Sequence, residues 1–250
     1  MFKLKQILIF LFVIGLLFYI FNFSVPLFIF TLVFLLGYVT YGSFRISSRI
    51  FVNSFCSNSK FPNGILLSFD DGPDPELSLE VLDILDEKKV KALFFVIGEK
   101  VSLNPGILKE IVNRGHSVGI HTFSHSTFFG FYSAKKVTDE IKKTGDVIFQ
   151  ATGISAQYFR PPFGITNPQI ASAVDETGLK VVGWSVRSFD TKIRKGREIL
   201  KKTLKKLKGG DIVLFHDTVK GTVDVLKSFI DMSRQKGFEF IEPEKFLAED

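Results

Sequence analysis

The sequence predicts an α/β fold in which a parallel sheet curls into an incomplete (β/α)7 barrel, preceded by an N-terminal transmembrane helical hairpin. Two observations predict it. The first forty-odd of the 250 residues are apolar and almost uncharged, whereas the remainder has the composition of one globular domain. In that remainder, runs rich in β-branched and aromatic residues alternate seven times with amphipathic segments. Consecutive β-then-α units imply a parallel sheet, and seven of them suit an incomplete barrel.

The N-terminal segment carries no charged residue from Ile7 to Tyr41. A bilayer core of about 30 Å needs about 20 apolar residues per helix, so the stretch suits two short spans better than one. The turn-forming residues 22–26 (NFSVP) interrupt it near the middle. We therefore predict that residues 1–44 anchor the protein in a bacterial-type inner membrane through two short transmembrane helices. A single long, kinked span is the alternative.

Basic residues flank this segment on both sides. Lys3 and Lys5 precede it, and Arg45 and Arg49 follow it. Under the positive-inside rule, a hairpin keeps both ends and the globular domain in the cytoplasm, whereas a single span exports the domain. The sequence leaves the side of the membrane open.

Residues 45–63 form a predicted polar linker, and residues 64–250 form the predicted globular domain. The expected strands of that domain are residues 65–69, 92–97, 117–120, 156–159, 180–184, 211–215 and 238–241.

Two of the amphipathic segments between the strands have recognisable ends. Asn104, followed by proline, opens one that Gly115 ends, and Asn167, followed by proline, opens another that Gly178 ends.

The formal net charge of +6 raises the question of a nucleic-acid partner. The lysines, however, recur at helical spacing, as at Lys135, Lys136, Lys142 and Lys143, which is typical of a solvated helix face. No recognised nucleic-acid-binding module appears. We expect the positive charge to attract the anionic surface of a membrane lipid bilayer. We expect no nucleic-acid partner and no obligate protein partner. The single cysteine, Cys56, excludes an internal disulfide.

Polar clusters follow the expected strands, at the barrel edge where chemistry gathers. They are residues 70–73, 121–125, 160–163, 184–190 and 214–217, and they contain three of the four histidines.

Two of these clusters have the residues of a metal site. His121 and His125 are four residues apart, and two neutral imidazoles plus one carboxylate make an open site for zinc or similar ions. Asp70 and Asp71 supply the carboxylate. Because adjacent side chains point in different directions, one can bind metal while the other faces the substrate as a base. Taken alone, the histidine pair can be structural, and the aspartates can belong to a simple turn.

Three further residues fit around a catalytic carboxylate. Arg160 would hold such a carboxylate ionised and oriented. His216 ends a strand, and Asp190 offers it a partner that would raise its pKa and suit it to act as an acid. For His116, which precedes a strand, we expect only a structural role.

Taken together and in order, four motifs resemble those of the polysaccharide deacetylases, which are carbohydrate esterase family 4 or the NodB-homology domain. The motifs are residues 68–73 (SFDDGP), the pair His121 and His125, residues 160–164 (RPPFG) and residues 214–216 (LFH). The resemblance spans roughly residues 64–241. It implies a distorted (β/α) barrel and a metal-dependent hydrolase that removes N-acetyl groups from amino sugars.

The resemblance also implies roles for individual residues. Asp71, His121 and His125 would hold a divalent metal, with zinc as the expected ion. Asp70 would be the general base that takes a proton from the attacking water, and Arg160 would steady it.

The remaining implied roles concern the leaving group and the acyl group. His216 would protonate the departing amine, with Asp190 tuning it. The backbone N–H near Phe163 would help to stabilise the oxyanion. Leu214 and Trp184 would line the slot for the acetyl methyl group.

Departures from the family pattern are modest. Ser68 stands where threonine is usual, Ile120 where asparagine is common, and Thr191 where tryptophan often follows the aspartate.

The substrate stays open between a cell-envelope glycan or oligosaccharide and an acetylated or formylated polyprenyl-linked amino sugar. An inactive carbohydrate-binding domain is disfavoured, because no expected base, metal ligand or acid is missing.

Overall fold

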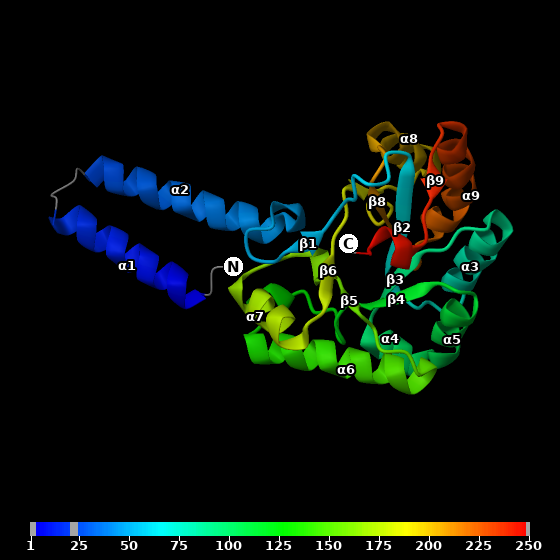
Figure 1. Ribbon diagram of the computed structural model, residues 1–250, viewed down its shortest axis with the longest axis horizontal. Helices are drawn as coiled ribbons and strands as arrows, with labels where there is room; N and C mark the ends of the chain where they lie inside the picture. The colour runs from blue at the N-terminus through cyan, green and yellow to red at the C-terminus, as the bar shows by residue number, and fades with distance from the viewer. Residues whose placement is uncertain (1–3, 21–24, 249–250) are drawn as a thin grey trace.

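The computed structural model describes residues 4–20 and 25–248 of the chain. Two helices, α1 (Leu4–Ile20) and α2 (Val25–Phe44), project from an α/β unit formed by the rest of the described chain (Figure 1). Lys3 and most of the expected turn at residues 22–26 lie outside the described residues.

A curled, parallel sheet forms the centre of the α/β unit and confirms the predicted fold class. Its strand order is β1-β6-β5-β4-β3-β2-β8-β7, and β9 pairs with the start of β2. The strands are β1 (Ser54–Phe55), β2 (Gly64–Gly72), β3 (Leu93–Val96), β4 (Ser117–Ile120), β5 (Tyr158–Phe159), β6 (Lys180–Val182), β7 (Val186–Arg187), β8 (Ile212–His216) and β9 (Glu239–Phe240). Each expected strand has a counterpart, whereas the two-residue strands β1 and β7 were not expected.

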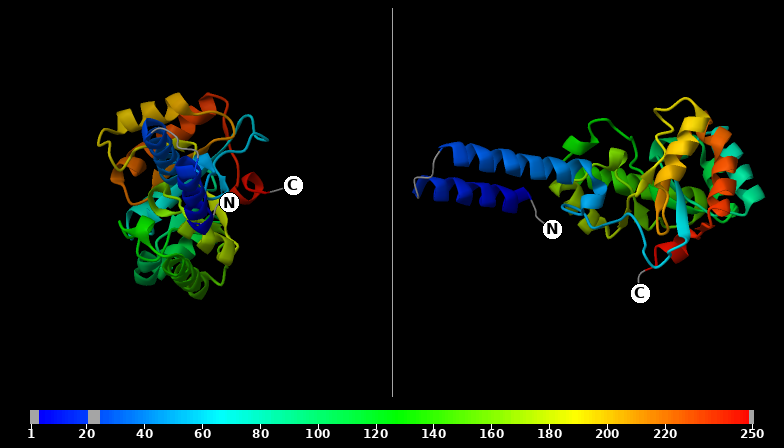
Figure 2. Two further views of the ribbon diagram at one scale, coloured as in Figure 1. Left: turned by 90° about the vertical axis from the view of Figure 1, so that its left-hand side faces the viewer. Right: turned by 90° about the horizontal axis from the view of Figure 1, so that it is seen from above.

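Helices surround the sheet and follow its strands along the chain (Figures 1 and 2). They are α3 (Leu77–Lys88), α4 (Gly98–Leu103), α5 (Pro105–Asn113), α6 (Ala134–Thr152), α7 (Pro168–Thr177), α8 (Gly196–Lys206), α9 (Lys220–Gln235) and α10 (Pro243–Phe246), with 3-10 turns η1 (Ile46–Ser48), η2 (Phe129–Phe131) and η3 (Pro162–Gly164).

The expected helix ends are present, although one cap differs. The Asn167 side chain accepts hydrogen bonds from the backbone at the start of α7, and Gly178 ends that helix with a φ of 68°. Asn104 precedes α5 but makes no side-chain cap bond, because its amide contacts the Lys100 carbonyl instead.

The sheet separates two apolar clusters because alternate strand residues face opposite sides. Phe69, Phe94 and Phe215 belong to the larger cluster, where the Phe215 ring packs edge-on against Phe229 of α9 at 5.2 Å. Leu66, Phe95 and Ile212 belong to the second cluster. Strand β2 is consequently buried almost throughout, as expected for a parallel strand covered on both faces.

The segment 45–63, expected as a linker, is partly built into the sheet. Ser54 and Phe55 pair with β6, and Phe51, Val52 and Cys56 are buried. Gly183 makes this packing possible, because a Cβ there would lie 2.6 Å from Cys56 Sγ. The expectation of a free linker was therefore wrong for this part of the segment.

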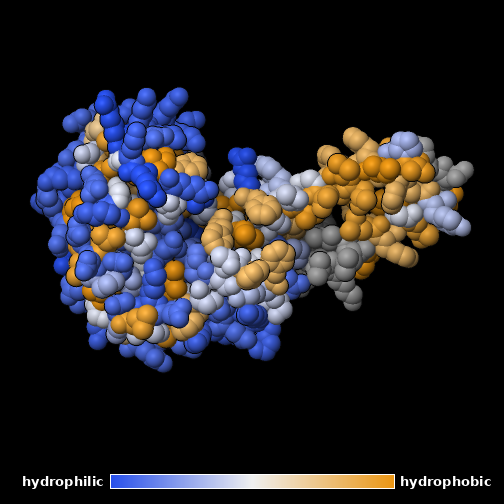
Figure 3. Space-filling view, turned by 180° about the vertical axis from the view of Figure 1, so that it is seen from behind, coloured by the Kyte–Doolittle hydropathy of each residue, from blue (hydrophilic) through white to orange (hydrophobic). Residues whose placement is uncertain are grey.

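Helices α1 and α2 lie side by side and run in opposite directions (Figures 1 and 2). The rings of Phe18 and Phe28 meet edge-to-face across them at 5.3 Å. By length and composition, α2 can cross a membrane, whereas the apolar stretch described in α1, residues 9–20, is shorter. Both helices present apolar side chains to their surroundings, as the orange extension in Figure 3 shows. The transmembrane hairpin stays a prediction.

The packing of residues 45–63 predicts a stability effect. Phe51 is 2% exposed, so Phe51→Ala should lower the free energy of unfolding by about 3–5 kcal/mol, the usual cost of truncating a buried phenylalanine. Chemical unfolding of the detergent-solubilised protein measures it. Phe44→Ala is the matched control, since Phe44 is 72% exposed. Equal, small effects of both substitutions would show that the segment does not belong to the folded core.

Candidate active site

The carboxyl ends of four strands bring the expected site residues together. Asp70 and Asp71 end β2, His121 follows β4, Arg160 follows β5 and His216 ends β8. In a curled parallel sheet these ends share one edge, which is why clusters far apart in the sequence meet.

Asp70 and Asp71 point in different directions because a bulge separates them. The pairing of β2 with β3 shifts register between Asp70 and Gly72, and Asp71 has a φ of 72°. An irregularity of this kind re-aims a side chain at the end of a strand. The Lys100 ammonium donates a hydrogen bond to the Asp71 carbonyl at 2.7 Å and holds the bulge in place.

Asp71, His121 and His125 form a candidate metal site. Asp71 Oδ1 lies 3.4 Å from His121 Nε2 and 3.3 Å from His125 Nε2, and one ligand atom from each residue falls within 4.8 Å of the others. Asp71 Oδ1 is buried and has no hydrogen-bond partner. Burying such an atom is costly unless a cation or donor meets it. This chemistry fits a divalent metal ion.

The hydrogen bonds of the two histidines suit metal binding. His121 Nδ1 lies 2.7 Å from the Arg160 carbonyl, which can only accept, so Nδ1 carries the proton and Nε2 keeps its lone pair. Burial and the neighbouring His121 lower the pKa of His125, which favours its neutral, ligating form. Burial raises the pKa of Asp71, but the adjacent imidazoles lower it by more, so the pKa lies below its ordinary value.

Glu140 of α6 holds the loop between the two histidines. Its carboxylate accepts hydrogen bonds from the backbone N–H groups of Phe123 and Ser124 at 2.9 and 2.8 Å. Sequence reasoning missed this residue because it lies in an amphipathic helix with no local sign of the contact.

Asp70 is paired with a buried cation. Arg160 has no exposed surface, and its Nη1 donates to Asp70 Oδ1 at 2.6 Å and to Ser68 Oγ at 3.1 Å. Nε and Nη2 donate to the carbonyls of Val182 and Gly183. Burial lowers the pKa of Arg160, which the Asp70 charge partly offsets. Asp70 Oδ2 is left facing His121 Nε2 at 3.8 Å.

His216 lies on the other side of Asp71, with its Nε2 3.9 Å from Asp71 Oδ2. Its Nδ1 lies 2.7 Å from Asp190 Oδ1, and Thr222 donates to Asp190 Oδ2 at 2.6 Å. Burial lowers the pKa of His216, but the bond to Asp190 and the nearby carboxylates raise it by more. The net shift is upward, which favours a protonated imidazole.

The residues expected to line the acyl slot also lie at this edge. The Phe163 ring, 47% exposed, meets the His125 ring at 4.9 Å, and its backbone has a φ of 60°. Leu214 is buried in β8. The Trp184 indole covers Gly164, where a Cβ would lie 2.6 Å from Trp184 Cη2.

Asp217 is a buried acid to which the sequence analysis gave no role. It is 1% exposed, and its carboxyl accepts a hydrogen bond from Ser78 Oγ while its Oδ1 has no partner. Burial raises the pKa of Asp217 to about 7. Gly72 leaves room for this carboxyl, since a Cβ there would lie 2.6 Å from Oδ1. The contact links the β8 end to the Asp71 bulge.

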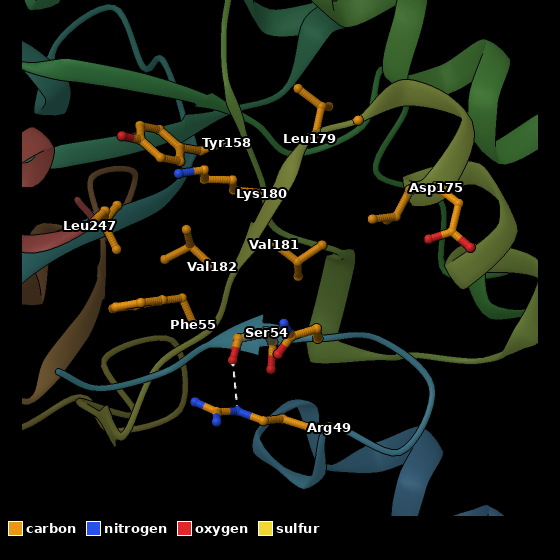
Figure 4. A pocket seen from close by; sticks show the side chains of 13 residues that line it. Arg49, Ser54, Phe55, Tyr158, Asp175, Leu179, Lys180, Val181, Val182 and Leu247 are labelled. Atoms are coloured by element: carbon orange, nitrogen blue, oxygen red, sulfur yellow. Dashed lines mark hydrogen bonds between the residues drawn. The ribbon is translucent and has the colours of Figure 1, made fainter. Parts of the chain in front are cut away.

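A separate cavity of about 480 Å³ lies away from this cluster (Figure 4). Tyr158 and Lys180, which begin β5 and β6, line it together with Phe55. Arg49 closes one side, where its Nε donates to the Ser54 carbonyl at 3.0 Å. None of the expected site residues lines this cavity.

A family model described as polysaccharide deacetylase matches residues 58–182. The chain belongs to the polysaccharide deacetylase family. Peptidoglycan-N-acetylglucosamine deacetylase PgdA of Listeria monocytogenes is 37% identical over 185 residues, which make up 74% of this chain and 39% of that protein. The chain thus spans well under half the length of this curated relative.

Solved structures of polysaccharide deacetylases superpose on the chain. The Bc1960 peptidoglycan N-acetylglucosamine deacetylase does so with a TM-score of 0.72 and 31% identity, over 77% of this chain and 91% of that one. A mutant of BA3943, a pseudoenzyme of the CE4 family from Bacillus anthracis, gives a TM-score of 0.74 at 25% identity, over 79% and 71% of the two chains. The fold therefore occurs both in a deacetylase and in a pseudoenzyme.

The metal site predicts the effect of losing one ligand. His125→Ala should weaken metal affinity by at least ~100-fold, since even outer-sphere partners of metal ligands contribute about 10–100-fold. Elemental analysis after dialysis measures the bound metal. His116→Asn is the control, because His116 lies outside the cluster and its Nδ1 accepts from Ala92 N–H, as an asparagine oxygen can. Full metal occupancy in His125→Ala would contradict the site.

Asp217 predicts a pH dependence of stability. Between its ordinary pKa of 3.8 and its folded pKa of about 7, the unfolded chain releases a proton that the folded protein keeps. The carboxyl therefore destabilises the fold increasingly as pH rises through this window. The free energy of unfolding of Asp217→Asn should equal that of wild type near pH 4 and exceed it by a few kcal/mol near pH 7.

Denaturant unfolding of the metal-free protein at several pH values measures this difference. Asp224→Asn, at an exposed acid of α9, is the control and should follow wild type throughout. A constant difference between Asp217→Asn and wild type from pH 4 to pH 7 would rule out the effect.

Proposed function

We propose that this polysaccharide deacetylase is a membrane-anchored, metal-dependent hydrolase that removes N-acetyl groups from the amino sugars of a cell-envelope glycan. The observation that carries the proposal is the convergence of the carboxylate of Asp71 and two imidazoles on one partly buried spot, flanked by Asp70 and His216. The relatives' names, which specify peptidoglycan N-acetylglucosamine, support a cell-wall amino sugar as the substrate.

Asp71, His121 and His125 would hold the divalent cation. We assign zinc, because two imidazoles and one carboxylate form an open site of the kind that catalytic zinc uses. Lewis-acid polarisation of the acetyl carbonyl is the chemistry that such a cation supplies there.

Asp70 is assigned as the general base. The Arg160 guanidinium fixes its Oδ1, which leaves Oδ2 directed toward the cluster. Oδ2 then takes the proton of the water that attacks the acetyl carbon. A base positioned in this way contributes about 10²–10⁴-fold to the rate.

His216 is assigned as the general acid. Its Nδ1 is held by Asp190, so its Nε2 proton points toward the cluster and is transferred to the amine nitrogen as the C–N bond breaks. Thr222 and the backbone N–H of Thr191 donate to the same Asp190 carboxylate and keep it oriented.

The acetyl group is assigned to the space beside Phe163, Leu214 and Trp184. The Phe163 backbone N–H would donate to the developing oxyanion, a preorganised contact that is stronger in the transition state than in the substrate. Leu214 and Trp184 would exclude water from the methyl group.

The anchor assignment rests on the two N-terminal helices. We assign residues 1–44 to an inner-membrane anchor and residues 64–250 to the catalytic domain. Helix α2 has the length and composition of a span, and Phe44 at its end is exposed.

The division of roles between the aspartates predicts the behaviour of Asp70→Asn. Because the amide cannot take a proton, acetate release from an N-acetylglucosamine oligomer should fall by about 10²–10⁴-fold. Bound metal, measured by elemental analysis, should stay near the wild-type level, since Asp71 is unchanged. Asp71→Asn should lose metal and activity together. Wild-type turnover in Asp70→Asn would falsify the assignment.

A further inference from the structure

The last turn of α2 is bonded directly to the catalytic loop. The Thr166 backbone N–H donates to the Ser43 carbonyl at 2.9 Å, and Thr166 Oγ1 donates to the Gly42 carbonyl at 2.8 Å. Gly42 is buried, with Phe51 so close that a Cβ would meet its ring at 2.9 Å. The helix end is therefore a fixed part of the domain surface and not a flexible tether.

This contact lies close to the chemistry. Thr166 belongs to the loop that begins at Arg160 and carries Phe163. Thr166 stands three positions after Phe163, a span of at most about 10 Å. The Phe163 ring in turn lies 4.9 Å from the His125 ring. The end of α2 thus positions the mouth of the metal site.

Two exposed aromatic side chains flank the same loop. The Asn167 amide donates to the Gly130 carbonyl at 2.8 Å, which fixes η2 beside the α2 end. On either side of Gly130, Phe128 is 68% exposed and Phe131 is 88% exposed, while Phe129 between them is buried. Phe128 and Phe131 therefore offer apolar area for an interaction at this loop.

The end of α2 also exposes an aromatic side chain. Phe44, in the last turn of α2, is 72% exposed. Figure 3 shows orange and pale side chains where the helices meet the domain, in contrast to the blue surface farther away. The membrane anchor proposed for α2 places the bilayer next to this end of the domain, so we assign the bilayer as the occupant of this surface; this part of the inference rests on the proposed anchor.

We propose that α2, Phe128 and Phe131 hold the catalytic mouth against the bilayer surface, and that the substrate is an N-acetylated amino sugar carried on a membrane lipid. The substrate part rests on the proposed deacetylase function. An amino sugar joined to a lipid through phosphate lies at the headgroup level, where the loop at Phe163 is held. The net charge of +6 favours such a phosphate-bearing, anionic surface.

Bilayer contact is tested without reference to activity. Phe131→Trp in the full-length protein is reconstituted in phosphatidylcholine vesicles with and without acyl chains brominated near the headgroup. Emission above the constant Trp184 background should be quenched by the brominated lipid. Phe149→Trp is the matched control, because Phe149 is 55% exposed on α6. Equal quenching in the two variants would overturn the bilayer contact.

The substrate is tested by comparing the release of acetate from two N-acetylated compounds. Wild type should deacetylate polyprenyl-diphosphate N-acetylglucosamine in vesicles with a kcat/KM at least about tenfold above that for soluble tri-N-acetylglucosamine, a difference of about 1.4 kcal/mol. The double variant Phe128→Ala, Phe131→Ala should lose this preference and keep its rate on the soluble oligomer. Preference for the soluble oligomer would overturn the lipid-linked substrate. If the protein turns over neither compound, the proposed function itself is refuted. The quenching result would still stand, because it does not depend on activity.

Discussion

The buried guanidinium of Arg160 is the interaction on which the site depends. A cation with no exposed surface needs hydrogen-bond partners, and each of the three guanidinium nitrogens of Arg160 has at least one. It donates to Asp70 of β2 and to the carbonyls of Val182 and Gly183 at the end of β6. Its own carbonyl accepts from His121. One residue thereby fixes the assigned base and orients an assigned metal ligand. Lysine could not replace it, since only the planar fork of arginine reaches these partners together.

The regular part of the fold was predictable because its signals are local. Strands such as β2 and β8 are continuous apolar runs, and the helices between them repeat with helical period. Strands β1 and β7 were not predicted, because they become strands only through pairing with β6 and β8. The segment 45–63 was predicted to be a linker, whereas part of it packs into the domain. Its composition is polar, and its burial depends on space that distant glycines leave, Gly183 after β6 for Cys56 and Gly42 in α2 for Phe51.

The candidate site was predictable to the extent that its residues stand at strand ends. Asp70, Asp71 and His216 follow apolar runs directly, so their meeting at one edge follows from the parallel sheet. Asp217 and Glu140 were not assigned, because their roles appear only once the chain has folded. Asp217 packs against the bulge at Gly72, and Glu140 reaches a loop from a helix. Bulges and long-range hydrogen bonds of this kind have no short-range signature.

Helix α2 and the candidate site are joined through one loop, which runs from Arg160 at the barrel end to Thr166 at the end of α2. The roles that we propose for this loop hold only if the cluster around Asp71 is a metal-dependent catalytic centre. Acetate release from an N-acetylglucosamine substrate by the purified full-length protein tests this most directly, first after exhaustive chelation and then with zinc restored. We expect no turnover without metal and full recovery at one equivalent of zinc. Undiminished turnover in verified metal-free protein would contradict it.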